Sequence, residues 1–358
     1  MKKGCILLLA ACLLLAGCGQ LPSAREMGDM ALLRTMGIDV APGGVTVTGS
    51  TGPRAKGIQA EDEPALVLSA ARESLSGACL AMQGQSDSYV FFGYVDQLLI
   101  GGELAEQGIR PVLDYFARDV ELGLGAQLWL VQGAAAGEAV AAGGDEGVDS
   151  RLETLRNDSE MGIAALTRTA GEVYTDLLEL GSSFVPALSP VGDETAVLTE
   201  RGYGILRGDA LAGFLEGEAA KGLELLAGGP AADILVEELS DQKVSVKITS
   251  AHTQSRLEFQ GDTPFVLKLT CKVEARLSEY RRRLEQEGLE QLKAGLEARE
   301  QARLALAMEQ LQALGTDCAG LGAKAGMFHP AKWQAVREDW PEWFGRVPVE
   351  IQVEVKIL

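Results

Sequence analysis

The residue with the clearest chemical role near the start of the chain is Cys18. It stands two residues after an unbroken apolar run, residues 5–16, which is itself preceded by two lysines. A transmembrane helix needs about 20 apolar residues, whereas a run of about 10–14 fits the apolar core of a secretory signal peptide. The pattern predicts a signal peptide over residues 1–17, with Cys18 immediately after the cleavage site.

The sequence Leu15-Ala16-Gly17-Cys18 resembles the lipobox of bacterial lipoproteins. In that pattern the cysteine thiol receives a diacylglyceryl group and becomes the first residue of the mature chain. Two acyl chains hold a protein stably at a bilayer, because each buried CH₂ contributes about 0.8 kcal/mol. We therefore predict Cys18 to be a lipidation site and membrane anchor. The alternative is an incidental cysteine in an ordinary signal peptide.

Metal-binding and cofactor-binding patterns are weak. The acidic loop at residues 144–150 is similar to a calcium loop, but the twelfth position counted from Asp145 is Arg156, where an EF-hand needs a bidentate glutamate. His252 and His329 have no companion at ligand spacing, and the sequence contains neither CxxC nor HExxH. We predict no metal and no cofactor other than the covalent lipid on Cys18.

The sequence offers no convincing catalytic nucleophile. It lacks a G-x-S-x-G elbow, and Ser250 near His252 is best interpreted as part of a polar strand end. Residues 320–324 match neither a Walker A loop nor a dinucleotide-binding turn. We predict a non-enzymatic protein. A wall-active hydrolase that uses Ser250 is the alternative.

Three of the four tryptophans, Trp333, Trp340 and Trp343, fall close together before the last strand. A helix from Pro330 would place Trp333, Arg337 and Trp340 on one side, at i, i+4 and i+7. These rings either cap the core of the last domain or form a partner interface, because tryptophan and arginine are enriched at binding hot spots. We keep both interpretations, with Trp333, Trp340 and Trp343 as candidate interface residues.

The charge of the chain limits its partners. Lysine and arginine number 32 against 51 acidic residues, and loss of Lys2 and Lys3 with the signal peptide leaves a net charge of −21. Such a surface repels phosphate backbones and anionic headgroups, so we predict no nucleic-acid partner and a folded part that stands off the membrane. Cys79, Cys271 and Cys318 allow at most one disulfide, and we expect all three to be buried.

The hydrophobic pattern predicts a mixed α/β (α+β) fold with three domains after the signal peptide at 1–17. These are an N-terminal mixed domain at 18–150, a middle domain at 151–240, and a C-terminal domain at 241–358 with an antiparallel sheet packed by a long amphipathic helix. We expect the helix at 278–314, and a final strand at 347–357 from strict alternation of apolar and polar residues. We also expect residues 64–82 to be helical, and two prolines to interrupt regular structure at 184–194.

Several motifs, in order along the chain, resemble the Ger(x)C family, the C-subunit lipoproteins of nutrient germinant receptors of endospore-forming bacteria. One departure is Leu321, where that family usually has phenylalanine. The matching residues are Arg25-Glu26-x-x-Asp29-x-Ala31, Gly37-Ile38-Asp39, Glu103-Leu104-Ala105-x-x-Gly108-Ile109, Arg118-Asp119, Gly202-Tyr203-Gly204, Leu211-x-Gly213-x-Leu215, Gly222-Leu223, Asp317-x-x-Gly320-x-Gly322, Pro330-x-x-Trp333 and Trp340-x-x-x-Phe344.

The resemblance implies a non-catalytic lipoprotein on the outer face of the cell or spore inner membrane. It would act with two polytopic membrane subunits, one channel-like and one similar to an amino-acid transporter, in a receptor that responds to nutrients. The resulting hypothesis is a lipid-anchored subunit required for spore germination. The alternative is a solute-binding lipoprotein that delivers a small molecule to a membrane transporter.

Overall fold

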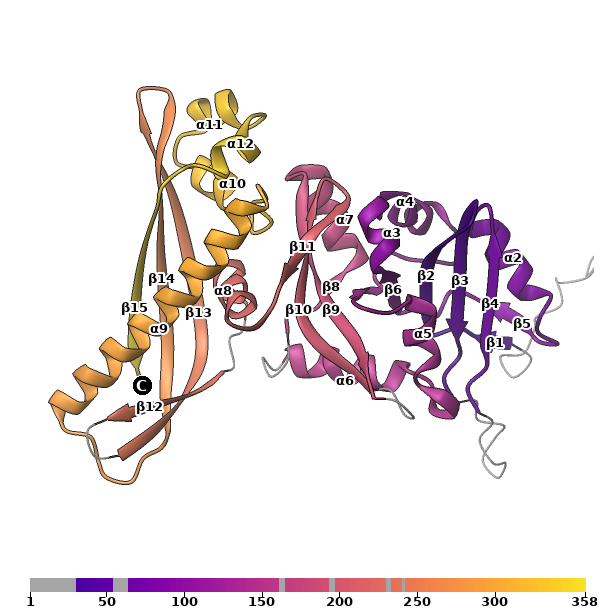
Figure 1. Cartoon of the computed structure of the whole chain (residues 1–358), viewed down its shortest axis with the longest axis horizontal. Coiled ribbons are helices and arrows are strands. Elements are labelled where there is room, and N and C mark those ends of the chain that lie inside the picture. The colour runs from indigo at the N-terminus through magenta and orange to yellow at the C-terminus, as the bar shows by residue number, and fades with distance from the viewer. Residues whose placement is uncertain (1–29, 54–63, 161–164, 193–196, 230–232, 240–241) are drawn as a thin grey trace, which may run out of the picture.

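The computed structural model describes residues 30–53, 64–160, 165–192, 197–229, 233–239 and 242–358. Cys18 and the predicted signal peptide lie outside these ranges. The described chain forms two units that follow one another along the long axis of the molecule, and each unit is built on one main β-sheet (Figure 1). Both units contain helices as well as strands, so the predicted mixed α/β class is confirmed.

A nine-stranded sheet forms the centre of the larger unit. Its strands are β2 (Thr35–Ala41), β3 (Gly44–Ser50), β4 (Val67–Arg72), β6 (Gln97–Gly101), β7 (Gln127–Val131), β8 (Arg168–Thr169), β9 (Ser182–Val191), β10 (Val197–Arg207) and β11 (Ala210–Leu215). Their order is β11-β10-β9-β7-β6-β2-β3-β4, with β8 paired to β7. The central strands β2, β6, β7 and β9 are parallel. A separate parallel pair joins β1 (Met30–Leu32) to β5 (Tyr89–Phe91).

Helices cover both faces of the central strands, which explains their uninterrupted apolar sequences. Leu98 and Leu128 pack with the residues of α3 and α4, whereas Leu99 and Trp129 pack with those of α5 and α6 on the other face. The bounds are α2 (Leu75–Gln83), α3 (Gly102–Gln107), α4 (Arg110–Arg118), α5 (Ala136–Ala141), the short 3₁₀ helix η2 (Gly144–Glu146), α6 (Asp149–Glu160) and α7 (Ala170–Glu179).

A four-stranded sheet and one long helix form the smaller unit. The elements are β12 (Ile234–Leu239), β13 (Gln242–Gln260), β14 (Thr263–Glu279), α9 (Gln286–Ala313) and β15 (Val349–Ile357). The expected antiparallel pairing holds from β12 to β14, but β15 runs parallel to β14. The reason is the crossover through α9, because a parallel neighbour needs a long connection of this kind.

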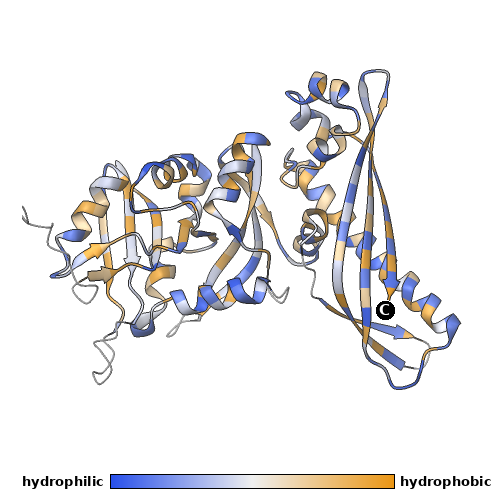
Figure 2. Cartoon of the chain, turned by 180° about the vertical axis from the view of Figure 1, so that it is seen from behind, coloured by the Kyte–Doolittle hydropathy of each residue, from blue (hydrophilic) through white to orange (hydrophobic). Residues whose placement is uncertain are grey.

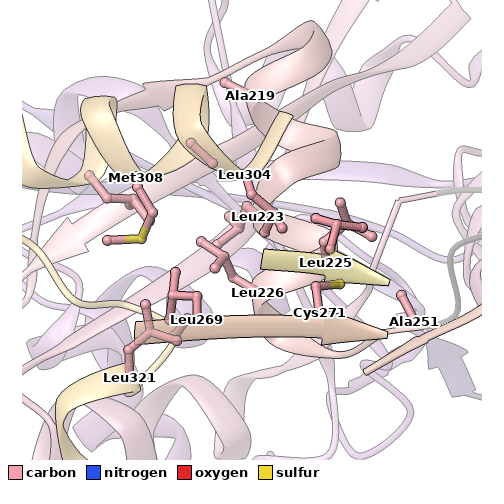
Figure 3. Close-up of a cluster of buried hydrophobic side chains, with 14 of the residues drawn as sticks. Ala219, Leu223, Leu225, Leu226, Ala251, Leu269, Cys271, Leu304, Met308 and Leu321 are labelled. Atoms are coloured by element: carbon pink, nitrogen blue, oxygen red, sulfur yellow. The ribbon is translucent and has the colours of Figure 1, made fainter. Parts of the chain in front are cut away.

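Helix α8 (Gly217–Ala227) lies against α9, and the two backbones approach closely at Gly222. A Cβ at that position would lie 2.1 Å from the carbonyl oxygen of Arg303. Leu223 and Leu226 of α8, Leu304 of α9 and Cys271 of β14 pack in one core (Figure 3). Tyr203 of β10 belongs to the same cluster, so a continuous apolar core joins the two units.

The buried hydrophobic residues of the described chain all lie between Ala31 and Val355. Removal of residues 1–18 therefore leaves each of these core residues in place. The division into residues 18–150, 151–240 and 241–358 stays a prediction, and the larger sheet continues across residue 150 because β9 pairs with β7. No helix in the described ranges combines the length and apolarity that a membrane crossing requires.

Two local expectations are wrong. Residues 64–82 form strand β4 and then helix α2, because Ser74 accepts a hydrogen bond from the Gly77 N–H and starts the helix there. Residues 184–191 belong to strand β9 despite Pro186 and Pro190, and residues 193–194 lie outside the described ranges. The ladder between β9 and β7 involves only Ala187 and Leu188, so the missing proline N–H groups remove no bond to β7.

Candidate functional site

The three predicted tryptophans lie on short helices after α9: α10 (Leu321–Gly326), α11 (Pro330–Val336) and α12 (Trp340–Phe344). The helix that starts at Pro330 ends at Val336, so the expected continuous stripe through Trp340 does not form. Trp333 and Trp340 nevertheless meet edge to face, with ring centroids 5.3 Å apart. Trp340 is buried, whereas Trp333 and Trp343 are half-buried.

Asp317 organises this region from inside the fold. One of its carboxylate oxygens accepts the N–H of Leu321 at 2.8 Å, and the other accepts the N–H of Gly322 at 2.7 Å. The second oxygen also accepts the indole N–H of Trp340 at 2.8 Å. One buried carboxylate therefore holds both the start of α10 and the ring of Trp340.

Glycines make room for the two indole rings. A Cβ at Gly322 would lie 2.2 Å from Cε2 of Trp340, and a Cβ at Gly326 would lie 2.3 Å from Cγ of Trp333. Gly320 has a φ of 65°, a left-handed conformation that favours glycine. The residues of the motif Asp317-x-x-Gly320-x-Gly322 thus form the site against which the Trp340 ring packs. This packing is the physical reason for the spacing seen in the sequence.

The Asp317 carboxylate is buried enough to be sensitive to substitution. Burial raises the pKa of Asp317, while the hydrogen bonds from Gly322, Trp340 and Leu321 act in the opposite direction. An asparagine would turn one NH₂ group toward an N–H donor, so at least one of the three donors would lose its acceptor.

We expect Asp317→Asn to lower the free energy of unfolding by about 1–3 kcal/mol, the cost of leaving a buried polar group unsatisfied. Urea denaturation followed by tryptophan fluorescence measures the change. Asp339→Asn is the matched control, because the exposed Asp339 side chain makes no capping hydrogen bond at the start of α12. An unchanged midpoint for Asp317→Asn would contradict the assigned role.

A groove of about 740 Å³ lies where these helices meet the larger unit. Its lining includes Trp333, Trp340 and Arg337 on one side and Arg207 on the other. Two hydrogen bonds beside the groove join the larger unit to the smaller one. Ser182 Oγ donates to the carbonyl oxygen of Asp317 at 3.0 Å, and the Arg207 guanidinium donates to the carbonyl oxygen of Leu314 at 3.2 Å. The groove is thus lined by tryptophan rings and arginine guanidinium groups, which are side chains enriched at binding surfaces.

Trp343 lies at the surface of the same helical region. The guanidinium of Arg346 stacks over its ring at 4.1 Å from the centroid. An exposed arginine on a half-buried tryptophan is the type of pair that protein interfaces use. The interface role of Trp333, Trp340 and Trp343 stays a prediction, and the structure shows in addition that Trp340 serves the core.

The motif Gly37-Ile38-Asp39 has a different local explanation. The two carboxylate oxygens of Asp39 accept the N–H groups of Ala136 and Gly137, at 2.7 and 2.8 Å, and so cap helix α5 from strand β2. Asp39 also lines a crevice of about 540 Å³ at the carboxyl ends of the central strands, together with Glu103 and Glu138. Sequence reasoning missed this crevice, because the residues come from three distant segments.

The three described cysteines are free and buried, as expected. Burial raises the pKa of the Cys79 thiol to about 11 and also raises the pKa of Cys271 and of Cys318. Because the thiolate is the reactive form, these thiols are poor nucleophiles at neutral pH.

The other residues singled out for chemistry do not converge. Ser250 Oγ lies 3.5 Å from a carboxylate oxygen of Glu274, and the exposed His252 is opposite Lys272 in the β13–β14 ladder. Both therefore belong to a polar strand surface. Among the described residues, no three histidine, cysteine or carboxylate side chains cluster in a way that suits a metal ion.

Comparison with protein-family models shows which family the chain belongs to. A model described as "Spore germination protein N-terminal domain" matches residues 23–190, and one described as "Spore germination B3/ GerAC like, C-terminal" matches residues 201–358. The chain belongs to the Ger(x)C family of spore germination proteins. Neither model describes an enzyme family.

A solved structure has a similar fold. The chain superposes on the protein of the "Crystal Structure of the GerBC protein" with a TM-score of 0.60 and 19% identity, covering 90% of this chain and 96% of that one. At this identity the likeness supports the shared fold alone. The sequences of curated proteins give no match.

Proposed function

We propose that this Ger(x)C protein is a non-enzymatic, lipid-anchored subunit of a membrane germinant receptor that is required for spore germination in response to nutrients. The observation that carries the proposal is the pair of family models that together span residues 23–190 and 201–358. Cys18, behind its short apolar run, supports the anchor and a location on the outer face of the membrane. Two polytopic membrane subunits are the proposed partners.

The anchor has a physical purpose in this arrangement. Attachment at one residue confines the folded units to a thin layer above the bilayer and raises their effective concentration against membrane partners. Weak contacts then suffice to form the complex, so an exposed aromatic surface of modest size can act as the recognition element.

Co-purification tests the assembly directly. Spore membranes are solubilised in mild detergent, the chain is captured through a C-terminal tag, and the captured proteins are identified by mass spectrometry. We expect two multi-spanning membrane proteins to be recovered with it. Recovery of the chain as a lone species at every detergent concentration would contradict the proposal.

The surface around Trp333, Trp340 and Trp343 is the proposed contact for one of these subunits. We expect Trp343→Ala to reduce the recovered membrane subunits several-fold while lowering the unfolding midpoint only modestly, because this half-buried ring packs on the outside of the core and takes no part in the Asp317 network. Tyr94→Ala, at an exposed aromatic residue of the larger unit, is the control. Equal recovery with both variants would remove Trp343 from the interface.

The alternative function is that of a solute-binding lipoprotein. The 740 Å³ groove is the reason to test it, because it is a candidate binding site for a small molecule. Calorimetry on the chain from Gly19 to Leu358, titrated with candidate nutrients, separates the two functions. We expect no tight binding, because the proposed role is that of a receptor subunit. Saturable micromolar binding by this chain alone would favour the solute-binding function.

A further inference from the structure

The far end of the smaller unit carries an exposed apolar surface that the family assignment does not explain. Met327 and Phe328, at the end of α10, expose 77% and 62% of their surface. Phe265, which follows the turn between β13 and β14, exposes 55%. Met327 and Phe328 are adjacent in the chain, and such a pair of exposed large apolar side chains is more than the single, scattered exposure expected of a soluble surface.

Basic side chains lie beside Phe328 and on the neighbouring hairpin. The guanidinium of Arg256 lies 5.8 Å from the centroid of Phe328, and the ammonium of Lys332 lies 5.4 Å from the centroid of Phe259. Lys332 also donates a hydrogen bond to the Gly261 carbonyl at 2.6 Å, which ties α11 to the β13–β14 turn. Helix and hairpin thus form one surface, which we call the tip surface: Arg256, Met327, Phe328 and Lys332.

The local charge of this region is opposite to that of the whole chain. Residues 318–337 contain Lys324, Lys332 and Arg337 but no acidic residue, in a protein with 51 acidic residues in 358. Of the carboxylates on the hairpin beside it, Glu258 pairs with Lys268 at 3.0 Å, while Asp262 lies exposed in the turn. The tip surface is therefore locally cationic.

The tip surface occupies an extremity of the fold. The β13–β14 turn and the short helices lie side by side at one end of the smaller unit, with α11 next to the turn (Figure 1). The view from behind shows the same arrangement (Figure 2). Large apolar side chains at such an end of the fold are readily buried by a soft, deformable partner surface.

We propose that the tip surface inserts shallowly into the headgroup region of an anionic lipid bilayer. Exposed apolar side chains flanked by lysine and arginine are the combination that binds such interfaces, the apolar groups by burial and each cation by about 1 kcal/mol. This contact is independent of Cys18 and would give the protein a second point of attachment.

Local charge outweighs the net charge of the chain in this contact. The Debye length is about 8 Å at physiological ionic strength, so acidic residues on the remote parts of both units are screened from the bilayer. Under this proposal, the predicted separation of the acidic protein from the membrane applies to most of its surface but not to the tip.

Vesicle sedimentation tests the proposal with the chain from Gly19 to Leu358, which lacks Cys18 and keeps every described core residue. The probes are vesicles of phosphatidylcholine alone and vesicles with an equal part of phosphatidylglycerol. We expect binding to the anionic vesicles that weakens with added salt. Met327→Asp with Phe328→Asp should lower the association constant at least about tenfold, since two apolar side chains no longer bury.

Matched controls separate insertion from a general loss of apolar surface. Leu80→Asp with Val120→Asp replaces residues of the larger unit that are 75% and 98% exposed, and this variant should bind like the unaltered chain. Urea denaturation of both variants checks that the fold is intact. Undiminished binding by the Met327 and Phe328 variant would overturn the proposal, whatever the outcome for Cys18 or for the receptor subunits.

A fluorescent label reports the environment of the tip directly. An environment-sensitive dye on Phe328→Cys should shift its emission to the blue with anionic vesicles, whereas the same dye on Val120→Cys should not. The native cysteines of the described chain are buried and should resist labelling. A shift seen only in spore membranes that contain the membrane subunits would identify the tip as a protein contact and reject the bilayer.

Discussion

Replacement of Arg303 by methionine is expected to lower the free energy of unfolding by about 3–5 kcal/mol, because it leaves a buried carboxylate without its partner. The Arg303 side chain is only 6% exposed and binds Glu300, Glu218 and Asp233. Glu300 is 1% exposed and cannot turn to solvent, whereas Glu218 and Asp233 are partly exposed and can. The expected loss therefore comes mainly from Glu300.

The loss should depend on pH in a defined direction. Burial raises the pKa of Glu300, and the charge of Arg303 opposes this effect. A carboxyl whose folded pKa is raised is unfavourable in the folded state when ionised, so its cost grows as the pH rises and disappears in acid. Without Arg303 that cost increases, so the variant should be weakest at neutral pH and recover below about pH 5.

Two further variants make this experiment specific. Arg299→Met, four residues earlier on α9, removes a partly exposed pair with Glu237 and should cost only about 0.2–1 kcal/mol. Combining Arg303→Met with Glu300→Gln removes the buried charge and should restore most of the stability at neutral pH. An equal loss in the Arg303 and Arg299 variants, measured by urea denaturation, would refute the assignment of a buried ion pair.

The second large effect concerns Cys18. We expect Cys18→Ala to abolish metabolic labelling with palmitate and to move the chain from the membrane fraction to the soluble fraction. Loss of both acyl chains removes an interaction worth about 0.8 kcal/mol for each buried CH₂, and the tip surface alone is too small to replace it. The unfolding midpoint should not change, because the described core begins at Ala31.

An uncleaved signal peptide could itself retain the variant at the membrane, so a second form is needed. In this form an ordinary secretory leader replaces residues 1–17 of the Cys18→Ala variant and is removed by the general signal peptidase. We expect release of most of that chain at physiological salt, because the tip surface alone binds weakly and reversibly. Persistent membrane association would show that contacts of the folded units, rather than acyl chains, hold the protein.

Local patterns were enough to predict several elements of this fold. Strand β15 follows from strict alternation and α9 from a long charged and leucine-rich stretch, since period-2 and helical patterns are properties of short segments. The local patterns near residues 102–107, 109–118 and 126–132 likewise indicate two helices and a strand, and the structure has α3, α4 and β7 there. The pairing of the strands was harder to predict from local patterns, because the direction of β15 relative to β14 depends on the crossover through α9.

The sequence by itself determined the family, the mixed fold class and the expected anchor at Cys18, because these rest on ordered motifs and on the apolarity of a short segment. Only the tertiary structure decided that Asp317 holds Trp340, that Arg303 neutralises Glu300, and that Phe328 shares a surface with Arg256. Apart from the pair on α9, these contacts join residues far apart in the chain, and burial, which sets their energies, emerges only when the elements pack.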